Sequence, residues 1–360
     1  MQRASIDRGL ACVHPFVRAN GKVQVIAHRG ASALRPEHTI AAYLKAIEDG
    51  ADFIEPDLVM SRDGVLVARH ECELSRSTDV ATHAAFAARR TRKSIDGVDV
   101  EGWFCEDFSF DELRSLRARE PLPDLRGRAH DGLHAIPAFD EIVALLDSES
   151  QRLKRTIGII PELKNSTHHH AIGLDPEGAL AAATRRHAVL RRVPFGIQSF
   201  EVANLIALHD ALCSSLDNIF LVQLIGEASE QPFDRQVAGD ARHDYAGMST
   251  PQGLAAIARY AHAVAVQRRS IVPLDAVSGK LAAATSLVAE AHAAGLAVQA
   301  WTVRPENHYL APALRCGTEP ATRCEAGMIK EIHALIDAGV DGVFVDDPAV
   351  GRQAADRPPH

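Results

Sequence analysis

Residues 25–71 decide the fold, and they read VIAHRGASALRPEHTIAAYLKAIEDGADFIEPDLVMSRDGVLVARHE. An apolar run rich in β-branched residues, 23–27, suits a strand that is buried on both faces. Pro36 then opens a segment with apolar residues at helical spacing, which ends at Gly50. The stretch therefore begins with one βα unit, and the polar sequence HRGAS follows its strand directly.

The next predicted strand, 52–58, carries two acidic residues. Glu55 and Asp57 are two positions apart, so a strand directs both carboxylates to the same side. Pro56 between them donates no ladder hydrogen bond, which is typical of a strand end. The turn SRDG follows, and the alternating residues VLVARH predict a short hairpin strand that brings His70 back toward the same end.

Eight strand signals alternate with helical segments along the chain. The predicted strands are 23–27, 52–58, 156–164, 193–199, 218–224, 263–266, 296–303 and 341–347. The predicted helices after the second strand include 136–147, 176–190, 201–210, 253–262, 279–294 and 328–337. Because polar residues gather after the strands, we expect an α/β fold, a TIM (β/α)₈ barrel with its site at the carboxyl ends of the strands. A doubly wound open sheet is the alternative, but no Gly-rich phosphate motif follows the first strand.

The βα rhythm is interrupted between the second and third predicted strands. Residues 71–133 are charged and rich in turn residues, and within them 107–119, DFSFDELRSLRAR, predict one amphipathic helix. We therefore expect a small inserted subdomain after strand two, at approximately 71–133, within a barrel that spans 23–350. An N-terminal extension, 1–22, and a C-terminal tail, 351–360, flank the predicted barrel.

The composition excludes several classes of protein. At 46% hydrophobic and 24% charged residues it is near the globular average, and no apolar run is long enough to predict stable membrane insertion. The formal net charge of -8 disfavours nucleic acid and anionic lipid surfaces as partners. We therefore expect a small-molecule substrate, whose phosphate would be held by local positive charge or a metal. The oligomeric state is left open.

Cysteine usage and the N-terminal residues bear on the compartment. The six cysteines are scattered and form no CxxC pair, so we expect them to be mostly reduced thiols. The first residues contain charges throughout and lack the apolar run of a signal peptide. We expect a cytoplasmic protein as the sequence is written, and a periplasmic one if a leader has been removed.

Three acidic residues are predicted to meet at the barrel mouth. Glu55 and Asp57 end the second predicted strand, and Glu162 arrives from the third. Mutual repulsion disfavours three ionised carboxylates in one place, and a hard cation relieves it. Oxygen ligands suit Ca²⁺ or Mg²⁺, so we expect a divalent cation there. The alternative is a solvated trio of acids at strand ends.

Histidines and basic residues accompany these acids. His28 and His70 have an unperturbed pKa of roughly 6.5, which suits an acid-base pair near neutral pH. Arg29 and Lys164 are candidates for holding a phosphate, and ion pairs to the three acids are their alternative role. Trp301, at the end of the seventh predicted strand, is a candidate apolar wall for a small alcohol, although a core role is nearly as plausible. Most of the other histidines, including the run HHH at 168–170, are expected to be bystanders.

These residues resemble the glycerophosphodiester phosphodiesterase family, and within it the longer, bacterial periplasmic-type branch. The resemblance covers roughly residues 23–348, and the motifs that carry it are HRGAS, PEHT, GADFIEPDLVMSRDG, LVARHE, STDVA, EDFSFDELRSLRARE, IIPELK, QSFE, LVQL, WTVR and GVDGVFVDDP. It implies a TIM barrel with an inserted subdomain, and hydrolysis of glycerophosphodiesters to an alcohol and sn-glycerol 3-phosphate. The chain departs from the family at Glu71, where an aspartate usually follows the histidine, and in lacking a visible secretion signal.

The resemblance also assigns roles to the candidate residues. It implies His28 and His70 as the acid-base pair and Arg29 as a phosphate ligand. It implies Ca²⁺ or Mg²⁺ bound by Glu55, Asp57 and Glu162, with Lys164 as a further basic residue and Trp301 as the wall at the glycerol end. The attacking group is left open between water and the neighbouring glycerol hydroxyl. Alternative functions are a lysophospholipase D-like phosphodiesterase and a non-catalytic barrel that binds a phosphodiester.

Overall fold

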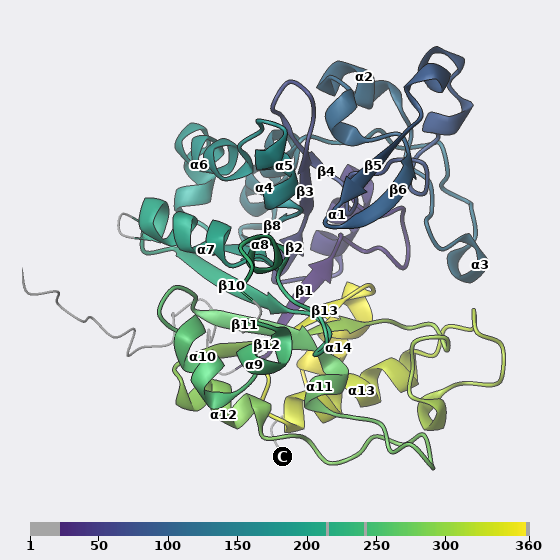
Figure 1. The fold of residues 1–360 in the computed structure, drawn as a ribbon. Coiled ribbons are helices and arrows are strands. Elements are labelled where there is room, and N and C mark those ends of the chain that lie inside the picture. The colour runs from purple at the N-terminus through teal and green to yellow at the C-terminus, as the bar shows by residue number, and fades with distance from the viewer. Residues whose placement is uncertain (1–21, 214–215, 241–242, 358–360) are drawn as a thin grey trace, which may run out of the picture.

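Eight parallel strands close into a barrel in the computed structural model, which describes residues 22–213, 216–240 and 243–357 (Figure 1). Strand β1 pairs with β2 on one side and with β13 on the other, and the β9–β10 pairing completes the ring. The barrel strands are β1 (Gln24–His28), β2 (Phe53–Glu55) continued by β3 (Asp57–Met60), β7 (Gly158–Ile159) continued by β8 (Glu162–Leu163), β9 (Phe195–Ser199), β10 (Ile219–Ile225), β11 (Ala263–Gln267), β12 (Ala297–Val303) and β13 (Gly342–Val345). The predicted TIM barrel is confirmed.

The second and third barrel strands are each interrupted by a proline. Pro56 separates β2 from β3, and Pro161 separates β7 from β8, because proline has no N–H to donate to the ladder. Pairing resumes beyond each proline, with Asp57 opposite Glu162 in the β3–β8 register. These two breaks lie at the end of the barrel where the candidate acids gather.

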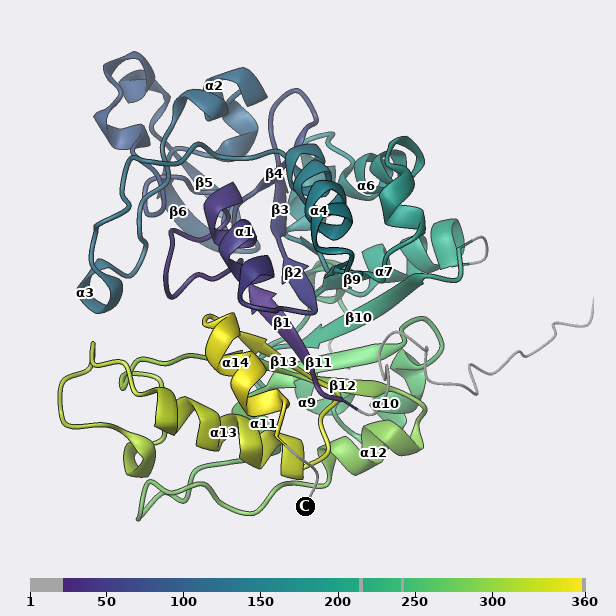
Figure 2. The same ribbon diagram turned by 180° about the vertical axis from the view of Figure 1, so that it is seen from behind.

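Helices cover the outside of the barrel, as the two opposite views show (Figures 1 and 2). They are α1 (Ile40–Glu48), α4 (Phe139–Leu153), α5 (Ser166–Ala171), α6 (Pro176–Arg186), η5 (Ala188–Arg191), α7 (Ala203–Leu208), η6 (His209–Cys213), α8 (Phe233–Val237), α9 (Tyr245–Met248), α10 (Pro251–Ile257), α11 (Arg268–Ile271), α12 (Leu287–Ala293), η7 (Pro312–Leu314), α13 (Glu325–Asp337) and α14 (Pro348–Ala355). The main core lies between these helices and the sheet, and a second apolar cluster that includes Ile26, Phe53 and Phe344 fills the barrel interior. Within the described residues, no helix combines the length and the apolar character needed to cross a membrane.

Residues 71–133 build a region with a small apolar core of its own. Its elements are η2 (Val80–Thr82), η3 (Ala84–Arg89), the antiparallel pair β5 (Thr91–Ile95) and β6 (Val98–Gly102), η4 (Cys105–Asp107), α2 (Phe110–Ser115) and α3 (Pro123–Arg126). The hairpin strand β4 (Leu66–Ala68) pairs antiparallel with β3 and leads into this region. Phe104, Phe108 and Leu113 are among its fully buried side chains.

Two predicted helices are much shorter in the structure, so their boundaries were wrong. The helix predicted over 107–119 is only α2, because Leu116 leaves helical geometry and is fully buried. The helix predicted over 279–294 begins at Leu287, since the preceding alanines are exposed and bury no apolar face. Helix α14 runs on to Ala355, because Val350 and Ala354 share its buried face.

The cysteine prediction was partly wrong. Cys316 and Cys324 form a disulfide, with their Cα atoms 5.3 Å apart. A backbone hydrogen bond from Cys324 to Pro305 and one from Cys316 to the Asn307 side chain bring the two segments together, which sequence spacing does not reveal. The other described cysteines, Cys72, Cys105 and Cys213, are free as expected, and Cys12 lies outside the described residues.

Candidate functional site

Three buried carboxylates meet at the carboxyl end of the barrel. Glu55 ends β2, Asp57 begins β3 and Glu162 begins β8, and one oxygen from each lies within 4.8 Å of the others. Glu162 also stands level with Gln198 in the β8–β9 register. The barrel topology thus brings together the three acids that the sequence singled out.

Their protonation preferences differ because their surroundings differ. Burial and the charge of Asp57 raise the pKa of Glu55 well above its usual range. Burial raises the pKa of Glu162 to about 8, against the opposing charge of Lys164. Although burial disfavours its charged form, the charge of Lys164 and a hydrogen bond from His38 hold the pKa of Asp57 well below its usual range. Without a cation, this centre therefore retains protons at neutral pH.

A hard divalent cation fits this arrangement. Asp57 Oδ1 is buried and has no hydrogen-bond partner among the described residues. The three side chains offer only oxygen atoms, which are the ligands that Ca²⁺ and Mg²⁺ prefer. Burial of repelling carboxylates without a partner is costly, so a cation would stabilise the charged form of all three. The trio could therefore hold a metal ion.

Residues that the sequence did not single out orient these acids. His38 is fully buried, with Nε2 2.9 Å from Asp57 Oδ2 and Nδ1 2.8 Å from the Tyr43 hydroxyl. Gln198 Nε2 donates to Glu55 Oε1 at 2.8 Å. In the sequence, His38 lies in the motif PEHT and Gln198 in QSFE, which could have indicated that both are near the site. The acid that each one contacts is determined only by the fold.

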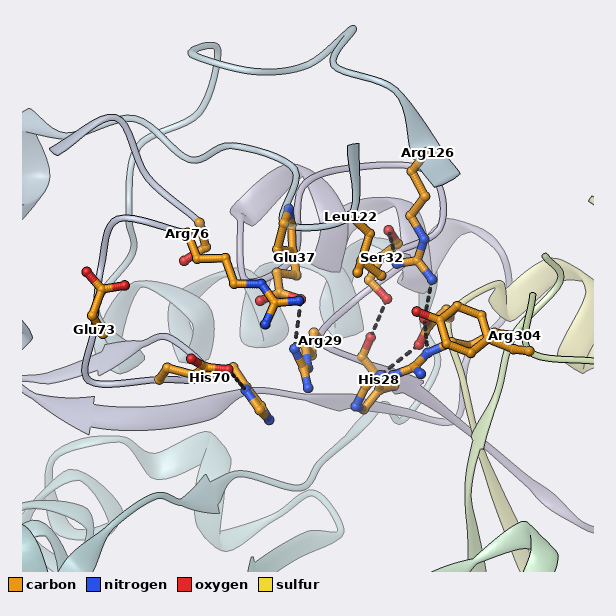
Figure 3. A pocket seen from close by; sticks show the side chains of 15 residues that line it. His28, Arg29, Ser32, Glu37, His70, Glu73, Arg76, Leu122, Arg126 and Arg304 are labelled. Atoms are coloured by element: carbon orange, nitrogen blue, oxygen red, sulfur yellow. Dashed lines mark hydrogen bonds and ion pairs between the residues drawn. The ribbon is translucent and has the colours of Figure 1, made fainter. Parts of the chain in front are cut away.

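His28 and His70 approach the same space from different elements. His28 ends β1 and His70 follows β4, and Figure 3 shows Arg29 between them. Burial and the charge of Arg29 lower the pKa of His28 to about 4. The same two causes hold the pKa of His70 well below its usual range. Both imidazoles therefore favour the neutral form at pH 7 when no substrate is bound.

A buried aspartate and two arginines hold His28. Asp346, directly after β13, accepts a hydrogen bond at 2.7 Å from His28 Nδ1. It also accepts from Arg304 Nε at 2.8 Å and from Arg126 Nη2 at 2.5 Å (Figure 3). These charges hold the pKa of Asp346 well below its usual range despite its burial. Asp346 was predicted only as part of the last strand signal, because a partner so distant in sequence leaves no local pattern.

Arg29 bridges the histidines and the acids. Its backbone N–H donates to Glu55 Oε2 at 2.8 Å, and its Nη1 donates to Glu37 Oε2 at 2.8 Å. Its Nε lies 3.4 Å from Asp57 Oδ2. Arg29 adopts φ 60°, a left-handed conformation that turns the chain sharply after β1. The guanidinium is thus both paired with acids and directed toward the space between the histidines.

Lys164 and Trp301 both lie beside the ring of Phe200. Lys164 Nζ lies 2.8 Å from Glu162 Oε1 and 5.7 Å from the ring centre of Phe200. Trp301 packs edge-on against Phe200 and donates its indole N–H to Ala265 O at 3.1 Å. Lys164 is therefore paired with an acid and Trp301 is packed against an aromatic ring, as their alternative roles predicted. Both side chains also line a cavity at the site.

Two cavities share His28, Arg29 and His70. The smaller, of about 100 Å³, is also lined by Glu55, Glu162, Lys164, Gln198, Phe200 and Trp301. The larger, of about 210 Å³, faces residues of the 71–133 region, and Figure 3 shows Arg76, Leu122 and Arg126 around it. The pair of histidines thus separates a carboxylate-lined chamber from an arginine-rich one.

The chain matches one known protein family over most of its length. The model of the glycerophosphoryl diester phosphodiesterase family matches residues 28–350. The glycerophosphodiester phosphodiesterase GDPD6 of Arabidopsis thaliana is 31% identical over 335 residues, covering 89% of this chain and 82% of that protein. A glycerophosphodiester phosphodiesterase of Haemophilus influenzae is 25% identical over 355 residues, covering 91% and 88%. A phosphodiesterase from Oleispira antarctica, solved with the product sn-glycerol-3-phosphate, has the same fold with a TM-score of 0.57 and 19% identity over 94% of this chain and 98% of that chain.

Proposed function

Because the chain belongs to the glycerophosphoryl diester phosphodiesterase family, we propose that it hydrolyses glycerophosphodiesters to an alcohol and sn-glycerol 3-phosphate. The observation that carries this proposal is one small cavity lined by two neutral histidines, three basic side chains and two carboxylates of the buried trio. The Oleispira phosphodiesterase was solved with the same product, which supports the choice of substrate. Incubation with glycerophosphocholine and enzymatic detection of sn-glycerol 3-phosphate tests it.

We propose Ca²⁺ or Mg²⁺ as the cofactor, held by Glu55, Asp57 and Glu162. When bound, such a cation polarises the phosphoryl oxygens as a Lewis acid. His38 and Gln198 fix the orientation of two of the ligands, so the oxygen set is arranged before any ion arrives. Arg29 and Lys164 add positive charge on either side, where they would hold the phosphate and its developing charge.

The two histidines would divide the proton transfers. Asp346 is a carboxylate and can only accept, so the proton of neutral His28 lies on Nδ1 and leaves Nε2 free. His28 would therefore be the base that deprotonates the nucleophile. His70 would protonate the departing alkoxide, because an arriving phosphodiester anion favours the charged imidazolium. The nucleophile is water or the neighbouring glycerol hydroxyl, and single-turnover ³¹P NMR decides between them by the appearance or absence of a cyclic phosphate that decays at a competent rate.

The larger cavity would take the alcohol that leaves. It adjoins the histidines on the side opposite Trp301, and its lining includes Arg76, Glu71 and Glu73 alongside a single leucine, Leu122. Such a charged lining suits a small polar head group, and it disfavours an acyl chain, which needs apolar surface. A higher kcat/KM on glycerophosphocholine than on lysophosphatidylcholine is expected. The reverse order would favour the lysophospholipase D-like alternative, and binding without turnover would favour the non-catalytic barrel.

The disulfide supports the periplasmic alternative for the compartment. Disulfides persist mainly in oxidising compartments, and Cys316 and Cys324 are joined in this chain. We therefore favour a periplasmic site of action. Alkylation and mass spectrometry of the protein isolated from its own cells, with and without reductant, tests this choice, and an already free Cys316 would contradict it.

A further inference from the structure

A second cluster of metal-binding side chains lies behind His70, outside the two cavities. Cys72 follows β4, Glu106 is on η4 and His168 is on α5. One donor atom of each lies within 4.8 Å of the others, and all three residues are buried. His168 Nε2 is 3.1 Å from Glu106 Oε1. Three elements thus present a thiol, a carboxylate and an imidazole to one point between the 71–133 region and the barrel.

Two polar atoms at this cluster have no partner among the described residues. Glu106 Oε2 is buried without a hydrogen bond, and so is Nδ1 of His169. Both residues are strongly buried, with exposed fractions of 6% for Glu106 and 0% for His169. A buried polar atom without a partner costs free energy, and a cation held by Glu106 would relieve that cost at Oε2, whereas His169 faces Cys72 with its other nitrogen, Nε2.

The donor set differs from that of the active site. Glu55, Asp57 and Glu162 offer only oxygen, whereas Cys72, Glu106 and His168 offer sulfur, oxygen and nitrogen. Sulfur and imidazole donors favour Zn²⁺ over Ca²⁺ or Mg²⁺. His169 Nε2 lies 3.9 Å from Cys72 Sγ, near the ~3.5 Å edge of a tetrahedral zinc site, so a small shift of this side chain would supply a fourth donor. We propose that Cys72, Glu106, His168 and His169 form a Zn²⁺ site that ties the 71–133 region to the barrel.

One basic side chain competes for this position. Lys93 Nζ lies 3.0 Å from Glu106 Oε1 and 2.7 Å from Asp107 Oδ1. Because Asp107 remains as a partner, the ammonium can stay paired when Zn²⁺ takes Glu106. The Cys72 thiol now donates toward Asn165 Oδ1 at 3.6 Å, and it loses this proton to solvent when the thiolate binds the metal. Zinc binding should therefore release protons and tighten as the pH rises.

The proposed zinc site would hold the chain segments next to His70 and Lys164. Cys72 is two residues after His70, and Asn165 is next to Lys164. A zinc ion would fix the two chain segments that carry these catalytic-site residues, without touching the substrate. The site is thus structural, and its test does not require the phosphodiesterase activity proposed above.

Zinc retention tests the proposal directly. Reduced, metal-free full-length protein is given a large excess of Mg²⁺ to fill the carboxylate trio, then Zn²⁺ alone, and is desalted before metal analysis. The wild type should retain one zinc per chain, and Cys72→Ser or His168→Gln should weaken zinc binding by ~10-fold or more. The matched controls Cys213→Ser and His209→Gln, which change residues outside every candidate metal cluster of the described residues, should bind zinc as the wild type does.

Cobalt and the competing lysine supply independent readouts. Co²⁺ in place of Zn²⁺ should give a sulfur-to-cobalt charge-transfer band in the near ultraviolet, which Cys72→Ser abolishes and Cys213→Ser preserves. Lys93→Met should tighten Zn²⁺ binding, an outcome that a folding defect cannot produce. Absence of retained zinc in the wild type, or equal retention in folded His168→Gln and His209→Gln, would overturn the proposal.

Discussion

His28 Nδ1 and Asp346 Oδ1 are 2.7 Å apart, although the two residues are 318 positions apart in the sequence. Closure of the barrel places β1 beside β13, and the hydrogen bond joins the ends of these two strands. Asp346 lines the larger cavity, and both of its carboxylate oxygens are already engaged by His28, Arg126 and Arg304. We therefore regard Asp346 as a positioning residue for the proposed base.

Asp346→Asn should reduce kcat by about 100-fold or more and change KM little. The amide can present N–H toward His28 and favour the wrong tautomer, as in other histidine–carboxylate pairs. Steady-state kinetics with glycerophosphocholine measures both constants. Asp337→Asn, at a largely exposed position that pairs with Arg357, is the matched control and should behave as the wild type. A loss in Asp346→Asn that lies wholly in KM would contradict the positioning role.

Arg126→Ala should destabilise the fold by about 3–5 kcal/mol and lower kcat as well. The substitution leaves Glu306 and Asp346 as buried carboxylates with one partner fewer, which is costly. Urea unfolding and steady-state kinetics measure the two effects. The neighbouring Arg128 is 67% exposed and meets Asp131 only at 4.0 Å, so Arg128→Ala should change neither. Equal effects of the two substitutions would show that α3 does not support His28, the proposed base.

Cation binding at the carboxylate trio should release protons near neutral pH. Without a cation the pKa of Glu162 is about 8, and that of Glu55 is also raised, so both hold protons that a bound cation displaces. Apparent affinity for Ca²⁺ or Mg²⁺ should therefore rise with pH through the neutral range toward about 8. Calorimetry in buffers of different ionisation enthalpy counts the protons. Affinity that does not change between pH 6 and 8 would contradict the raised pKa values.

The acid limb of the pH–rate profile should lie below the usual range of histidine. The proposed base must be neutral, and burial lowers the pKa of His28 to about 4, so kcat/KM should fall as the pH drops toward that value. The same shift affects stability: the unfolded chain takes up this proton below its pKa of about 6.5, so the folded state loses stability as the pH falls from about 6.5 to 4. An acid limb centred at 6.5 would contradict the burial of His28.

Much of the barrel can be predicted from local sequence patterns. The predictions that the structure contradicts failed for physical reasons. The strand predicted over 218–224 contains the apolar run 219–222, which the parallel barrel buries. The segment 279–286 has good helix formers, yet it stays irregular because it buries no face. The Cys316–Cys324 bond depends on contacts of the loop before α13, which spacing does not encode.

The candidate site could likewise be predicted only in part from the sequence. Glu55, Asp57, Glu162, His28 and His70 could be predicted because each lies at a strand end with a residue type that suits the chemistry. His38, Glu37 and Asp346 could not be given roles, because those depend on which strand ends become neighbours in three dimensions. The division into an extension, a barrel with its insertion and a tail stays a prediction.

One measurement tests the central proposal most directly: release of sn-glycerol 3-phosphate from glycerophosphocholine by chelated protein, before and after separate addition of Ca²⁺ and Mg²⁺. The account predicts no release after chelation, recovery with one or both ions, and loss of that recovery in His28→Ala and Glu55→Gln. Full activity in the presence of chelator, or undiminished activity of His28→Ala, would contradict it.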